Sequence, residues 1–185
     1  MAQTPSNTLP LGSKATDFEL MDTVTDEFMT LQECKGLNGT VIMFICNHCP
    51  FVKHVNQELV RMAKDFKSKG INFVAISSND AEKYPQDAPD KMKEHAKNEG
   101  YIFPYLYDAT QKIAKAYQAA CTPDFYVFNE TLSLVYHGQL DDSRPGNEKT
   151  IDGYDIRHAI KAMLDHLPVN QNQKPSIGCS IKWRT

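Results

Sequence analysis

Two cysteines at close spacing give this sequence its clearest chemical feature. The segment 44–54 contains Cys46 and Cys49 with two residues between them, and Pro50 follows directly. Thiols three residues apart can meet across a turn closely enough to form a disulfide. The thiolate form is the nucleophile in such chemistry. The pair therefore predicts thiol–disulfide redox activity, or else two small buried side chains.

The elements around the pair indicate which cysteine reacts first. The unbroken apolar run 41–45 predicts a buried strand. The apolar residues of 50–69 recur every three or four positions, which predicts a helix, and Pro50 suits its first position. Cys49 is then the N-cap residue, where free amides and the helix dipole favour an anion. We predict Cys49 as the attacking thiolate and Cys46 as the resolving thiol; the reverse order is the alternative.

The rest of the chain predicts a single α/β domain over 1–185. A second buried strand over 71–76 completes a strand–helix–strand unit of the size of a βαβ crossover. Residues 1–14 are expected to form a loose arm and residues 168–185 an irregular tail. The other expected elements are strands at 15–20, 28–31, 103–107, 125–128 and 132–137, and helices at 90–100, 109–120 and 154–167.

Composition excludes several classes of protein. The 185 residues are 41% hydrophobic and 23% charged, which is typical of a globular chain and not of a disordered one. The net charge of −3 argues against nucleic acid or an anionic membrane as a partner. No apolar run is long enough to span a bilayer. The start of the chain does not resemble a secretion signal, and five cysteines is an odd number, so we expect a cytoplasmic protein.

Several short motifs together resemble one known family. The strand–Cys-x-x-Cys-Pro–helix segment and Thr122-Pro123 are similar to the thioredoxin superfamily. The combination most closely resembles the peroxiredoxin-like 1 group, which is related to the AhpC/TSA and redoxin families. The resemblance implies a thioredoxin-like (glutaredoxin-type) three-layer α/β/α fold with a mixed central sheet and an N-terminal β-hairpin extension. The motifs that carry it are 46–54, 77–80, 121–124, 138–145 and 175–183.

The resemblance also implies roles for individual residues. It aligns Cys49 with the peroxidatic cysteine, and Thr122-Pro123 with a cis-proline loop that would expose the Thr122 backbone to an extended substrate; an ordinary trans turn is the alternative. Peroxiredoxins carry Thr or Ser three residues before that cysteine and Pro seven before it. This chain has Cys46 and Ile42 there. The departures favour dithiol–disulfide exchange, with a thiol peroxidase of low efficiency as the alternative.

Four further residues are candidates for the site. As an imidazolium, His48 would lower the thiol pKa values and tune the reduction potential, or it is an exposed loop histidine. Arg144 would stabilise a thiolate or bind an anionic group, or it pairs with a neighbouring aspartate. Cys121 and Cys179 are further redox thiols, or buried bystanders.

The expected partners are a disulfide or peroxide substrate and an external thiol reductant. No cofactor or metal is expected, and a homodimer is compatible with the sequence. A rival hypothesis from another class is a Cu or Zn chaperone on the same fold, with Cys46, Cys49 and His137 as ligands. A third is a non-catalytic adaptor that needs no reactive thiol.

Overall fold

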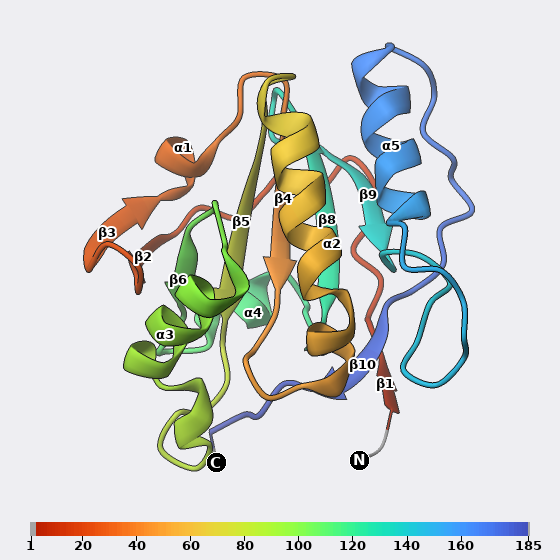
Figure 1. Ribbon diagram of the computed structural model, residues 1–185. Coiled ribbons are helices and arrows are strands. Elements are labelled where there is room, and N and C mark those ends of the chain that lie inside the picture. The colour runs from red at the N-terminus through yellow and green to blue at the C-terminus, as the bar shows by residue number, and fades with distance from the viewer. Residues whose placement is uncertain (1–2, 185) are drawn as a thin grey trace.

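A mixed sheet of seven strands forms the centre of the protein (Figure 1). The computed structural model describes residues 3–184. The strands lie in the order β3-β2-β6-β5-β4-β8-β9. Their bounds are β2 Glu19–Asp22, β3 Glu27–Thr30, β4 Gly39–Phe44, β5 Ile71–Ser77, β6 Tyr105–Tyr107, β8 Asp124–Asn129 and β9 Leu134–Gly138.

The middle of the sheet contains the predicted strand–helix–strand unit. Strands β4 and β5 pair in parallel, and helix α2 (Pro50–Lys67) connects them. Strand β6 adds in parallel to β5, whereas β8 and β9 add antiparallel on the other side of β4. The hairpin β2–β3 extends the sheet beyond β6. These pairings confirm the mixed sheet and the N-terminal hairpin.

Helices cover both faces of the sheet, which confirms the three-layer expectation. Val41 and Met43 of β4 pack in the core beneath α2, α3 (Pro89–Glu99) and α5 (Tyr154–Leu164). Ile42 and Phe44 point to the opposite core, which α1 (Leu31–Cys34) and α4 (Lys112–Ala116) help to close. Because side chains alternate along a strand, an unbroken apolar run is what a strand between two cores needs. None of the helices in residues 3–184 is long and apolar enough to cross a membrane.

The two ends of the chain are more ordered than the sequence suggested. Strand β10 (Ile177–Ser180) lies between β1 (Gln3–Pro5) and β7 (Cys121–Thr122) in a second, antiparallel sheet. The loose arm expected over 1–14 and the irregular tail expected over 168–185 therefore each contain a strand. Both form by pairing between segments far apart in the sequence. Residues 1, 2 and 185 of these expectations lie outside the described part of the chain.

Candidate active site

The two cysteines lie where β4 is followed by α2. Cys49 is the N-cap residue of α2, with extended backbone angles (φ −67°, ψ 123°), and Pro50 opens the helix. Both match the prediction. Proline lacks an N–H and its fixed φ suits the first turn, so the helix begins directly after Cys49. The first N–H groups of the helix have no partner within it, and that of Val52 helps to lower the pKa of Cys49.

The electrostatics separate the two thiols. A hydrogen bond from the Cys46 thiol is the largest influence on Cys49 and, with donors from Cys179, Val52 and Thr122, outweighs burial and lowers the pKa of Cys49 to about 5. The same hydrogen bond, together with burial and the nearby charge of Asp87, raises the pKa of Cys46 well above its usual value. At neutral pH the pair therefore holds one thiolate, at Cys49, and one thiol.

A cis-proline loop faces the pair. The Thr122–Pro123 peptide bond is cis, as the family resemblance implied. In its thiol form Cys49 donates from Sγ to the backbone oxygen of Thr122 at 3.2 Å. The Thr122 hydroxyl lies 3.4 Å from the Sγ of Cys46. One residue of this loop thus contacts both sulfur atoms, through its backbone and its side chain.

His48 is hydrogen-bonded to a buried carboxylate that the sequence did not identify. Its Nδ1 lies 2.6 Å from Oδ2 of Asp87, which also accepts from Nδ2 of Asn79 at 2.8 Å. The backbone N–H of Asn47 donates to Oδ1 of Asp87 at 2.8 Å. Burial favours a raised pKa for Asp87, but the hydrogen bonds from His48 and Asn79 outweigh it and lower the pKa. The ring of His48 also stacks on Tyr84, and its side chain is 16% exposed.

The structure brings together a different set of candidate metal ligands from the one predicted. Within residues 3–184, Cys46, His48 and Asp87 bring three ligand-type atoms within 4.8 Å of one another. Hydrogen bonds already occupy the Asp87 oxygens, and we assign no metal there. His137, the predicted ligand, accepts the N–H of Leu9 at Nδ1 and bonds Asp124 through Nε2. A histidine whose two ring nitrogens are both engaged offers no lone pair to a metal.

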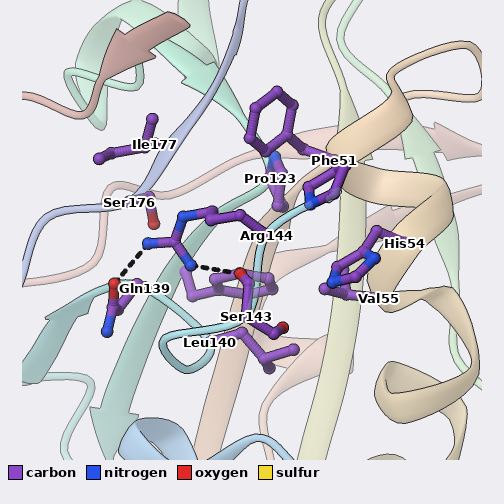
Figure 2. A pocket seen from close by; sticks show the side chains of 12 residues that line it. Phe51, His54, Val55, Pro123, Gln139, Leu140, Ser143, Arg144, Ser176 and Ile177 are labelled. Carbon is purple, nitrogen blue, oxygen red and sulfur yellow. Dashed lines mark hydrogen bonds between the residues drawn. The ribbon is translucent and has the colours of Figure 1, made fainter. Parts of the chain in front are cut away.

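Arg144 lines a small pocket beside Pro123, with a volume of about 20 Å³ (Figure 2). Its guanidinium donates to the backbone oxygens of Asp141 at 2.7 Å and Ser143 at 2.6 Å, and to Oε1 of Gln139. The bond to Asp141 is thus to the backbone and not the carboxylate, unlike the expected aspartate pair. These contacts hold the guanidinium turned toward its own loop (Figure 2).

His54, on α2, also lines this pocket. Figure 2 shows it on the α2 wall of the pocket, with Phe51 and Val55. Its Nε2 is buried without a hydrogen-bond partner in the described structure. Helical spacing alone gave no sign of this, because the wall opposite comes from the distant loop that carries Arg144.

The remaining cysteines differ in how they face the site. None of the five cysteines forms a disulfide in the described structure. Cys179 of β10 lies directly opposite Thr122, and its thiol is one of the groups that lower the pKa of Cys49. The Sγ of Cys121 instead lies 3.9 Å from the backbone oxygen of Pro123. Burial raises the pKa of both thiols, for Cys179 to about 12. Cys34 belongs to the opposite core.

Fold and site together define a protein of thioredoxin-like architecture with a dithiol at the start of a helix. Residues 11–137 match the model of the AhpC/TSA family, and the chain belongs to that family. A search of curated proteins gave no match.

Solved structures extend the comparison over the whole chain. An uncharacterized conserved protein from Geobacillus kaustophilus is 57% identical, with a TM-score of 0.98, covering 100% of this chain and 97% of that one. A hypothetical protein from Sinorhizobium meliloti 1021 is 46% identical, with a TM-score of 0.96 and coverage of 98% and 99%. The peroxidoxin BcpB of Mycobacterium tuberculosis shares the fold at 18% identity, with a TM-score of 0.64 and coverage of 86% and 98%.

Proposed function

We propose that the protein is a thiol-dependent oxidoreductase in which Cys49 is the nucleophile and Cys46 the resolving thiol. The observation that carries the proposal is the asymmetry of the pair. The pKa of Cys49 is lowered to about 5 and that of Cys46 is raised, while Thr122 contacts both sulfur atoms. A thiolate beside a protonated thiol supplies both an attacking group and a second group that can complete the exchange.

With a disulfide substrate, the Cys49 thiolate attacks one substrate sulfur. A mixed disulfide forms, and the other substrate sulfur leaves as a thiolate. Cys46 then loses its proton and attacks Sγ of Cys49, which releases the second substrate thiol and closes the Cys46–Cys49 disulfide. An external thiol reductant restores the dithiol by two further exchanges. Each step exchanges one S–S bond for another, and the substrate disulfide is reduced overall.

A peroxide is the second candidate oxidant, and the burial of the site favours it. The Cys49 side chain is fully buried, so a small oxidant reaches it more readily than a protein does. The thiolate would attack one peroxide oxygen, form a sulfenic acid and release an alcohol or water. Cys46 would then displace hydroxide, which leaves as water, to give the same Cys46–Cys49 disulfide. Membership of the AhpC/TSA family also supports the reaction with a peroxide.

The proposed compartment is the cytoplasm, because five free thiols suit a reducing environment. Metal content of the purified protein provides a test against the chaperone hypothesis, since a bound stoichiometric metal would favour that rival. Reaction of the reduced enzyme with hydrogen peroxide and, separately, with a protein disulfide would show which oxidant it prefers.

The decisive experiment is a thiolate titration of the wild type, Cys46→Ser and Cys49→Ser. Ultraviolet absorbance reports the thiolate without a reagent having to reach the buried sulfur. We expect one thiolate with a midpoint near 5 in the wild type, absent in Cys49→Ser. In Cys46→Ser the midpoint remains below the usual value of 9.0, because the amides of α2 are unchanged. If Cys49 titrates no earlier than the buried Cys34, the mechanism is wrong.

A further inference from the structure

Strand β10 lies directly against the cis-proline loop. Its residues pair antiparallel with β7, with Cys179 opposite Thr122 and Ser180 opposite Cys121. The approach is close at Gly178, where an added Cβ would lie only 2.0 Å from the backbone oxygen of Thr122. That oxygen is also the acceptor for the Cys49 thiol. Only glycine allows β10 to lie this near the backbone of the cis-proline loop.

The register decides which cysteine of the small sheet faces the active pair. Directly opposite residues in an antiparallel pair place their side chains on the same face. The Thr122 hydroxyl is in contact with Cys46, so the Cys179 side chain lies on the face of the active pair. Cys121 directly precedes Thr122 in β7 and so points to the other face. Cys179 also shares the core cluster that contains Cys46 and Cys49, and it is 3% exposed.

The backbone edge that an extended substrate would use is already occupied. An extended peptide binds such an edge by adding a strand to it. Here β10 is that added strand, and the residues after it are held by further backbone contacts. The N–H of Ile181 donates to Ala120 O at 3.0 Å, and the N–H of Lys182 donates to Oδ1 of Asn79 at 2.8 Å. The tail therefore places a paired strand and a cysteine at the edge that an extended substrate would use.

We propose that β10 occupies the substrate position of the cis-proline loop within the same chain, and that Cys179 exchanges disulfides with Cys49. The exchange starts from the Cys46–Cys49 disulfide and so rests on the proposed function. Cys179 loses its proton and attacks Sγ of Cys49. The Cys49–Cys179 bond forms, the Cys46–Cys49 bond breaks, and Cys46 leaves as a thiolate that takes up a proton. The step exchanges one disulfide for another, so the protein undergoes no net oxidation or reduction.

The proposal has a consequence for the class of substrate. While β10 is in place, Cys49 is open only to small oxidants such as peroxides and low-molecular-weight disulfides. A protein disulfide reaches Cys49 only when β10 leaves β7. The Cys179 thiol also helps to lower the pKa of Cys49, which fits its position opposite Thr122 in the reduced state.

The test removes the competing thiol and maps the product. Reduced Cys46→Ser is treated with equimolar hydrogen peroxide in the presence of dimedone, which traps sulfenic acids, and peptides are mapped without reduction. We expect a Cys49–Cys179 disulfide within one chain. Cys46→Ser/Cys179→Ser should carry the dimedone adduct on Cys49 instead. Cys46→Ser/Cys121→Ser is the matched control and should still form the disulfide.

The outcomes separate this inference from the proposed function. If Cys46→Ser accumulates as much dimedone adduct as the variant that also lacks Cys179, the role of Cys179 is disproved while Cys49 remains the nucleophile. If a cysteine other than Cys49 carries the dimedone adduct in Cys46→Ser/Cys179→Ser, Cys49 is not the most reactive thiol and both proposals fall.

A second measurement tests the strand itself. Gly178→Ala should displace β10 and speed the labelling of Cys49 by a bulky maleimide by at least about tenfold, which corresponds to 1.4 kcal/mol in the opening equilibrium. Gly100→Ala is the control, because its positive φ (+73°) strains an added side chain while its Cβ would meet open space, so it lacks the contact with Thr122. Equal labelling rates in the two variants would contradict the proposal that β10 occupies this edge.

Discussion

At the scale of single residues, one buried carboxylate affects the protonation of the resolving thiol. Asp87 is fully buried and accepts hydrogen bonds from His48, Asn79 and the backbone of Asn47. Its negative charge is one of the influences that raise the pKa of Cys46. It therefore helps to keep the resolving thiol protonated until the mixed disulfide has formed.

We predict that Asp87→Asn lowers the pKa of Cys46 and reduces the stability of the protein by about 1–3 kcal/mol. The pKa falls because a nearby negative charge is lost; the stability falls because a buried hydrogen-bond network loses its charged acceptor. Thiolate titration of the Cys49→Ser background and urea unfolding measure the two effects. Asp108→Asn is the control, since Asp108 is a buried acceptor for Ser78 and Ala114. An equal shift of the Cys46 pKa in both variants would contradict the assignment.

At the scale of elements, ion pairs hold helix α2 against α5 at positions well beyond its first turn. Arg157 of α5 donates to Oε1 of Glu58 on α2 from Nε at 2.9 Å and Nη2 at 2.7 Å, and to Asp65 at 2.7 Å. Glu58 is only 3% exposed. A buried carboxylate that loses a partner is costly, because its charge remains out of water.

Arg157→Met should therefore lower the free energy of unfolding by about 2–3 kcal/mol, less than for a fully buried pair because Arg61 still bonds Glu58. The Cys49 pKa should not change. Urea unfolding and thiolate titration measure the two quantities. Arg61→Met is the matched control: its side chain is 57% exposed, so its loss should cost less than about 1 kcal/mol. Similar losses for the two variants would show that the α2–α5 contact is not the stronger one.

The sequence could predict those parts of the site whose structure is determined by neighbouring residues in the chain. The Cys-x-x-Cys-Pro segment carries its own evidence, because the apolar run, the proline and the helical spacing are contiguous. Strand β10 has no such local signal: Ile177–Ser180 becomes a strand only by pairing with β1 and β7, both distant in the sequence. Asp87 was missed for the same reason. It reaches His48 across 39 residues, from a polar segment without periodicity.

The cis-proline loop shows a different limit. Nothing in the types or spacing of Thr122 and Pro123 distinguishes a cis bond from a trans one, and only the family resemblance pointed to it. The structure then adds what the resemblance could not: the occupied edge opposite Thr122, and the two sulfur atoms that this residue contacts.

At the scale of the whole molecule, the lowered pKa of Cys49 links the active site to folding. The thiol has a usual pKa of 9.0 and a pKa of about 5 in the folded protein. Between these values the folded state binds fewer protons than the unfolded state, so stability rises with pH. The contribution is lost as the pH falls through 5. Two pKa units separate pH 7 from the folded value, which makes it about 3 kcal/mol at pH 7.

We therefore expect the reduced wild type to gain stability relative to Cys49→Ser by about 1.4 kcal/mol for each pH unit between 5.5 and 8. Urea unfolding at several pH values, with excess reductant, measures both proteins, and their difference cancels the titration of groups that they share. Oxidised wild type is the second control: a Cys46–Cys49 disulfide has no thiolate, so its curve should run parallel to that of Cys49→Ser. The same stabilisation of the reduced form would make the disulfide a strong oxidant. Parallel curves for all three proteins would mean that folding does not stabilise the Cys49 anion, and the nucleophile would have to be sought at Cys46.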